Sequence, residues 1–91
     1  MSSEVSKVTK DQDVDKDKAP RLIVYNDTVN SFENVIESLM EVCEHTYEQS
    51  EQCAWIIHNK GKYAVKSGVD HDKLLAMQAA LILRGLQAEV E

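Results

Sequence analysis

The stretch Leu22–Met40, LIVYNDTVNSFENVIESLM, decides how the chain is expected to fold. It begins with β-branched and apolar residues, which favour a strand, and it ends with apolar residues at the three- and four-residue steps of a helix. Between these parts lie six mostly small polar residues, Asn26–Ser31, although a strand-to-helix connection needs only about two or three. The excess of polar side chains indicates that this connection does more than reverse the chain.

The apolar run Arg21–Tyr25 is the first expected strand, and Asn30 or Ser31 can cap the helix after it. The apolar side chains of this helix recur at helical spacing and make one buried face. They are Phe32, Val35, Ile36, Leu39, Met40 and Cys43.

A second helix is expected to begin at Thr46, because Thr46 and Gln49 have the spacing of a capping box. Gly61 is suited to follow its end, since the residue after a helix often takes a left-handed conformation. Lys62–Ser67 then alternates like a second strand.

Asp70 is expected to cap a third helix over residues 71–84, which Gly85 ends, and Leu86–Val90 alternates like a last strand. The expected core face of the third helix is Leu74, Leu75, Met77, Gln78, Ala80, Leu81 and Leu83. The order β-α-α-β-α-β predicts an α+β fold, a two-layer sandwich in which a three-stranded antiparallel sheet packs against three helices.

Residues 1–19 differ in composition from the rest of the chain. They contain four Lys and five acidic residues, no aromatic residue and no regular apolar period. Such a segment buries too little apolar area to offset its ordering entropy. We therefore expect a disordered N-terminal extension over residues 1–19 and one folded domain over residues 20–91.

Charge and composition exclude several classes of function. The net charge is −6, and six Lys/Arg against eleven Asp/Glu follow Pro20 without the basic stripe that nucleic-acid binding needs. No apolar run is long enough for a membrane span, and the N-terminus lacks the apolar region of a signal peptide. Cys43 and Cys53 are expected to be two reduced, buried thiols of a cytoplasmic protein, without disulfide or metal.

The sequence carries no catalytic signature, so we expect a protein that is not an enzyme. It has no GxSxG, no HExxH, no P-loop and no glycine-rich dinucleotide turn. His45, His58 and His71 lack metal-ligand spacing. No cofactor and no metal are expected.

Two features remain as candidates for a binding site, the polar connection Asn26–Ser31 and His58. Taken separately, each has an ordinary explanation, because Asn and Asp cap their own backbone and a histidine near a helix C-terminus interacts favourably with the helix dipole. In the expected fold, however, the two features would lie side by side.

Asn26, Asp27 and His58 would then offer acceptors to one small donor group. The apolar side chains beside them are Phe32, Val35, Ala54 and Ile57. Such a site matches an α-ammonium group next to an apolar side chain.

These residues carry a resemblance to the ClpS family, the adaptors that deliver N-degron substrates to the Clp ATP-dependent protease. The resemblance runs from about Arg21 to Glu91 and rests on VYNDTVNSF, VIESLMEV, IIHNKGKYAV and GLQAEVE. It implies the β-α-α-β-α-β fold and a binding role without catalysis. It also implies that Asn26, Asp27 and His58 hold the substrate's free α-amino group.

The resemblance further implies a pocket for a first residue such as Leu, Phe, Tyr or Trp. The walls of that pocket fall on Asn30, Phe32, Val35, Ala54, Ile57 and Leu86. The implied partners are N-degron peptides and a Clp ATPase of the ClpA or ClpC type, which would engage residues 1–19, and the chain is expected to be a monomer.

Three features depart from the family pattern. Thr28 stands where a second Asp is usual, which removes a charge worth about 0.5–1 kcal/mol. Asn30-Ser31-Phe32 replaces a common Thr-Pro-Met, and Ala54 replaces a larger aliphatic residue. The third helix is also shorter before Gly85.

Two other functions fit the same elements. One is an interaction domain like the C-terminal domain of the ribosomal stalk protein, which has the same order of elements. That type carries Lys and Ala on its first helices, whereas this chain carries Glu37, Glu41, Glu44, Glu48 and Glu51. The other is a diverged adaptor without selectivity for the amino-terminal residue, which Thr28 motivates.

Overall fold

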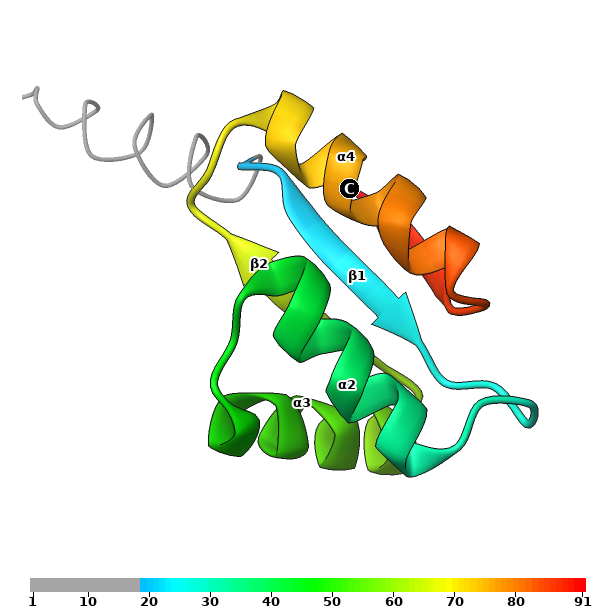
Figure 1. Ribbon diagram of the computed structural model, residues 1–91. Helices are drawn as coiled ribbons and strands as arrows, with labels where there is room; N and C mark the ends of the chain where they lie inside the picture. The colour runs from blue at the N-terminus through cyan, green and yellow to red at the C-terminus, as the bar shows by residue number, and fades with distance from the viewer. Residues whose placement is uncertain (1–18) are drawn as a thin grey trace, which may run out of the picture.

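The computed structural model describes residues 19–91. The elements are β1 (Arg21–Tyr25), α2 (Phe32–Cys43), α3 (Tyr47–Lys60), β2 (Lys62–Ser67), α4 (His71–Leu83) and β3 (Gln87–Val90) (Figure 1). The predicted order of elements is confirmed, as are the bounds of the first two strands. The predicted N-terminal extension, residues 1–19, lies outside the described residues except for Ala19.

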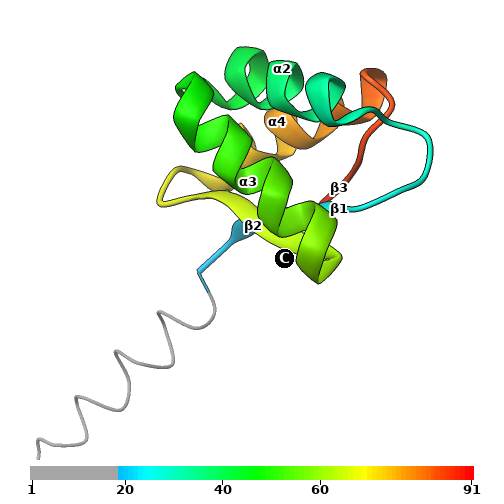
Figure 2. The ribbon, with the colours of Figure 1, turned by 90° about the horizontal axis from the view of Figure 1, so that it is seen from below.

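The domain has two layers. The sheet has the order β2-β1-β3, and both neighbouring pairs are antiparallel. The three helices cover one face of this sheet (Figure 2). The central strand β1 is the most deeply buried part of the sheet, because Leu22, Ile23 and Val24 are at most 4% exposed. The predicted α+β sandwich is confirmed.

Strand β2 contains a bulge. Leu22 lies opposite Lys66, whereas Ile23 lies opposite Ala64, so Val65 is the extra residue. Val65 is buried, and its carbonyl oxygen lies 2.7 Å from Nε2 of His45, within hydrogen-bond distance. The bulge thereby links the sheet to the connection between α2 and α3.

Local sequence signals fix the ends of the first two helices. Ser31 Oγ accepts a hydrogen bond from the backbone N–H of Asn34 at the start of α2. Thr46 and Gln49 form the predicted capping box of α3, and Gly61 follows that helix with a φ of 94°. Asp70 precedes α4 as predicted, but its side chain makes no capping hydrogen bond.

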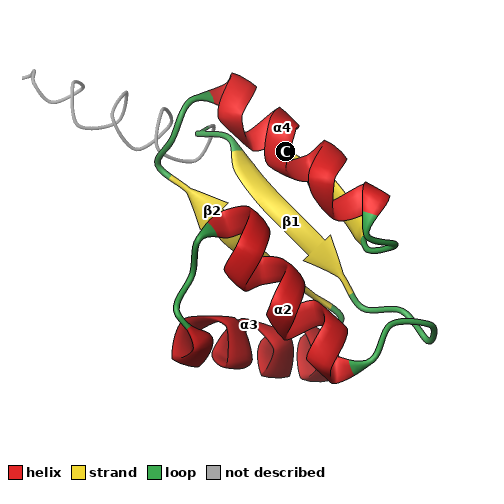
Figure 3. Cartoon of the chain, viewed as in Figure 1, coloured by secondary structure: helices red, strands yellow, loops and turns green. Residues whose placement is uncertain are grey.

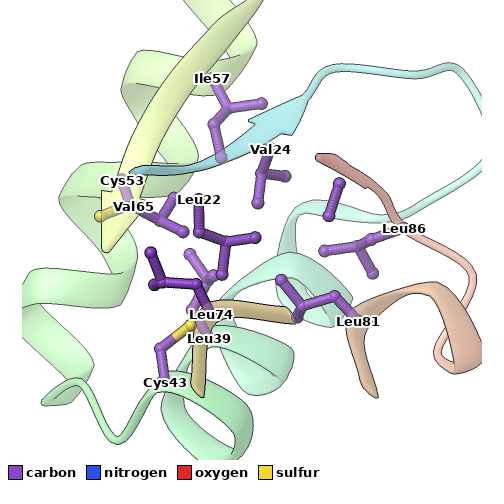
Figure 4. Close-up of a cluster of buried hydrophobic side chains, with 11 residues drawn as sticks. Leu22, Val24, Leu39, Cys43, Cys53, Ile57, Val65, Leu74, Leu81 and Leu86 are labelled. Atoms are coloured by element: carbon purple, nitrogen blue, oxygen red, sulfur yellow. The ribbon is translucent and has the colours of Figure 1, made fainter. Parts of the chain in front are cut away.

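Side chains from the sheet and all three helices form one buried apolar cluster (Figure 4). Its members are Leu22, Val24, Leu39, Cys43, Cys53, Ile57, Val65, Leu74, Leu81, Leu86 and Ala88. The prediction for α2 was wrong at Met40, which is 37% exposed, and it missed Ser38, which is fully buried. Because α2 packs against both α3 and α4, the stripe that it buries includes a small polar side chain.

Helix α4 departs further from the predicted core face. Leu74 and Leu81 are fully buried, but Leu75 is 41% and Leu83 is 88% exposed. No charged residue occurs between Leu74 and Leu83, so the pattern could not show which side of the helix faces solvent. Leu86 belongs to the turn before β3, because its N–H donates to the carbonyl of Leu81 at 3.0 Å.

Within residues 19–91, none of the helices has the length and apolarity that a membrane span requires.

Both thiols are buried and free, as the sequence predicted. Burial raises the pKa of the Cys43 thiol to about 11 and also raises the pKa of Cys53. Since the thiolate is the reactive form, neither cysteine should react with a thiol reagent at pH 8 in the folded protein. Both should react in 6 M guanidinium chloride, and a rapidly reacting thiol in the native state would contradict this prediction.

Candidate functional site

A cavity of about 370 Å³ lies where the β1–α2 loop meets the first turn of α2 and the last turns of α3. Figure 3 shows this loop as a long connection between the end of β1 and the start of α2. The cavity is lined by Asn26, Asp27, Asn30, Phe32, Val35, Ala54, Trp55, Ile57 and His58. It therefore contains every residue predicted for the site except Leu86, and it adds Trp55.

The carboxylate of Asp27 is held in place by the loop that follows it. Its Oδ1 accepts hydrogen bonds from the backbone N–H groups of Val29 at 2.9 Å and Asn30 at 2.8 Å. Its Oδ2 accepts from Nδ2 of Asn30 at 2.9 Å. These bonds, with the backbone N–H of Asn30 the strongest cause, lower the pKa of Asp27 below its ordinary value of 3.8. Asp27 is therefore ionised at neutral pH.

A carboxylate has about four lone-pair positions, and the loop uses three of those on Asp27. One position remains for a donor in the cavity. Since the group is already ionised and oriented, a cationic ligand would meet an acceptor that needs no rearrangement.

Asn30 connects three parts of the chain. Its Nδ2 donates to Asp27 and also to the carbonyl oxygen of Gly85 at 2.8 Å, in the turn before β3. Its Oδ1 accepts from Nδ2 of Asn34 in the first turn of α2. The polar groups of Asn30 thus already have partners, so this residue supports the cavity wall and is not an open acceptor.

Asn26 joins the loop to the end of α3. Its backbone N–H donates to the carbonyl oxygen of Gly61 at 2.9 Å. Gly61 lies three residues after His58, so this bond brings the start of the loop to the helix end that carries the imidazole. The polar part of the cavity lining consequently consists of Asn26, Asp27 and His58, together with Asn30.

The rest of the lining is apolar and aromatic. Ala54 and Ile57 are buried, with 2% and 3% of their surface exposed. The rings of Phe32 and Trp55 meet edge to face with their centroids 5.0 Å apart. Trp55 also lies 6.4 Å from the His58 ring, and because it is 51% exposed it stands partly in solvent beside the cavity.

Sequence reasoning missed Trp55, although a signal was present. Trp55 precedes His58 by three residues, and residues three apart share a helix face. A half-exposed tryptophan beside a candidate ligand residue could have been placed in the site on this spacing alone.

Leu86 and Thr28 lie away from the cavity lining. Leu86 is 4% exposed in the core and borders a different hollow with Tyr25 and Ile82. Thr28 is exposed in the β1–α2 loop and is absent from the residues that line the cavity.

Within residues 19–91, no three His, Cys, Asp or Glu side chains are grouped as metal ligands would be.

A protein-family model described as "ATP-dependent Clp protease adaptor protein ClpS" matches residues 15–88. This chain belongs to the ClpS family. The match confirms the family resemblance seen in the sequence. ClpS adaptors bind Clp ATPases and N-degron substrates. A comparison with curated proteins found no match.

The ClpS fold is also found in a solved structure, Agrobacterium tumefaciens ClpS2 bound to L-phenylalaninamide. That protein is 19% identical to this chain, with a TM-score of 0.73. The match covers 81% of this chain and 95% of the other. At this identity the likeness establishes the fold.

Replacing Asn30 should destabilise the domain, because Asn30→Ala removes three side-chain hydrogen bonds, one within the loop and two that join the loop to α2 and to the turn before β3. We expect the free energy of unfolding to fall by about 2 kcal/mol, as measured by urea denaturation. Thr28→Ala, in the same loop but exposed, should change it by less than about 0.5 kcal/mol. Equal effects of the two substitutions would show that the Asn30 bonds do not hold the loop.

Asp27 should make folding stability depend on pH. Since folding lowers its pKa from 3.8, the ionised carboxylate stabilises the folded state above that value. The contribution is lost as the pH falls through the lower pKa of the folded protein. Asp27→Asn should therefore reduce the free energy of unfolding at pH 7 and flatten its decline between about pH 5 and pH 2.

Glu37→Gln is the matched control for this titration, because it removes one exposed carboxylate from the middle of α2. Thermal unfolding followed by circular dichroism across this pH range measures both variants. A pH profile of Asp27→Asn parallel to that of the unsubstituted protein would contradict the prediction.

Proposed function

We propose that this protein is an adaptor that binds substrates through a large hydrophobic amino-terminal residue and delivers them to a Clp AAA+ ATPase. The observation that carries the proposal is a single cavity that combines an ionised, oriented Asp27 with an apolar and aromatic wall. An amino-terminal residue presents the matching pair of groups, a positive α-ammonium and a side chain on the same α-carbon.

The polar lining offers suitable acceptors for the ammonium. An α-ammonium has three N–H donors, and three residues of the same cavity lining, Asp27, Asn26 and His58, have side chains that can accept hydrogen bonds. An imidazole in its neutral form has one acceptor nitrogen to offer, and Asp27 supplies the charge-assisted bond. Acetylation of the amino group removes both its charge and two of its donors, so it should abolish this recognition.

The apolar lining supports a large first residue. Buried Ala54 and Ile57 with the rings of Phe32 and Trp55 give a wall that favours Leu, Phe, Tyr or Trp over small or charged side chains. ClpS2, bound to L-phenylalaninamide, holds a ligand with a free amino group and an aromatic side chain. The shared fold and family support the same ligand class for this chain.

Delivery to the protease rests on family membership. We propose that the partner is a Clp ATPase of the ClpA or ClpC type, that residues 1–19 engage it, and that the adaptor acts as a cytoplasmic monomer.

The interaction domain of the ribosomal stalk type is disfavoured by charge, because that type carries Lys and Ala on its first helices. In this chain the corresponding segment carries Glu37, Glu41, Glu44, Glu48 and Glu51. The diverged adaptor without selectivity for the first residue stays an alternative, because Thr28 still stands where a second Asp is usual.

Isothermal titration calorimetry tests the proposal with peptides that begin with Leu or Phe. The free peptides should bind, and their acetylated forms should bind at least about tenfold more weakly, because a charge-assisted hydrogen bond is lost. Asp27→Asn and His58→Ala should each weaken binding by a similar factor, whereas the adjacent Asn59→Ala should not. Equal affinity for free and acetylated peptides would refute recognition of the amino group.

A further inference from the structure

A second hollow, of about 560 Å³, lies between α2 and α3. Its apolar lining comes from Phe32, Ile36, Met40 and Tyr47. Its acidic lining comes from Glu33, Glu37 and Glu51. We refer to this surface as the α2–α3 groove.

The α2–α3 groove adjoins the cavity lined by Asp27 and His58, since Phe32 belongs to the lining of both. Phe32 opens α2, where its ring meets that of Trp55 near the end of α3. Met40 and Tyr47 lie toward the opposite end of the helix pair. They are 37% and 50% exposed, so the groove offers apolar surface along its length.

The charges around the groove are of one sign. From Phe32 to Asn59 the sequence contains six Glu and no Lys or Arg. Among the described residues, Arg84 pairs with Glu41, which lies outside the groove lining. An occupant of this surface should therefore combine apolar side chains with Lys or Arg.

The length of the groove matches a short extended peptide. Met40 lies eight residues after Phe32, which corresponds to about 12 Å along a helix at 1.5 Å per residue. An extended chain advances about 3.3 Å per residue, so about four residues span this distance. A substrate whose first residue occupies the cavity would place its next residues along the groove.

We propose that the α2–α3 groove binds the residues that directly follow the substrate's first residue, and that it selects Lys or Arg among them. This inference rests on the proposed function, because it takes the bound amino-terminal residue as its starting point. Residues 1–18 of the chain itself are a poorer occupant, since their four Lys are outnumbered by five acidic residues.

Three peptides with a free amino-terminal Leu test the proposal. They are identical except at residues 3 and 5, which are both Lys, both Gln or both Glu. Against the full chain in about 50 mM salt, the Lys peptide should bind about three- to tenfold more tightly than the Glu peptide, with the Gln peptide between them. The ratio should shrink in about 500 mM salt, because screening weakens exposed charge pairs.

A pair of matched variants locates the effect. Glu37→Gln combined with Glu51→Gln removes two charges from the groove lining and should lower the ratio of the two affinities toward one. Glu44→Gln combined with Glu48→Gln removes the same charge from two exposed positions, just after α2 and in the first turn of α3, outside the lining. This double variant should keep most of the ratio. Thermal unfolding verifies that both double variants are folded.

Two results would overturn the groove proposal. One is equal affinity for the three free peptides, and the other is an equal loss of the ratio in both double variants, which would show a general charge effect. Failure of the proposed function can be distinguished from failure of the groove proposal. It would appear as equal binding of the free and acetylated Gln peptides, whose residues 3 and 5 carry no charge for the groove to attract.

Discussion

The amide of Asn30 holds together the three segments on which the candidate site depends. One nitrogen donates to the carboxylate of Asp27 and to the carbonyl of Gly85, and the oxygen accepts from Asn34. The loop, the first helix and the turn before the last strand are thereby fixed relative to one another. A carboxylate on a long loop would otherwise be mobile, and ordering it during ligand binding would cost conformational entropy.

This network explains the excess of polar residues between β1 and α2. Some of these groups face the cavity, while others satisfy the loop's own backbone or cap the helix, as Ser31 does. The two roles meet in Asp27, whose bonds to the loop both orient it and keep it ionised. The same hydrogen bonds therefore stabilise the loop and keep the carboxylate of the candidate site oriented and ionised.

Much of the fold could be predicted from the sequence, because its signals are local. The β-branched run Arg21–Tyr25, the Thr46 capping box and Gly61 each act within a few residues. The exposed side of α4 could not be predicted, since an apolar helix is oriented only by its packing partners. Leu75 and Leu83 were wrongly assigned to the core for this reason.

The residues of the candidate site could likewise be predicted where local sequence places them, but not where a contact joins distant segments. Eight of its nine predicted residues line one cavity, because the connection after β1 and the end of α3 meet in this order of elements. Leu86 does not line this cavity, because its backbone N–H bonds to Leu81 near the end of α4 and its side chain is buried in the core. The bond between Asn30 and Gly85 spans 55 residues, and no short-range pattern encodes it.

Trp55 has a practical consequence of its own. It is the chain's single tryptophan, it is half exposed, and it lies 6.4 Å from the imidazole of His58. Its indole emission therefore reports on one place in the molecule, without background from any other tryptophan. Ligands that cover the ring or alter its polarity can be followed optically in the unlabelled protein, so the chain carries an intrinsic fluorescent probe beside the candidate site.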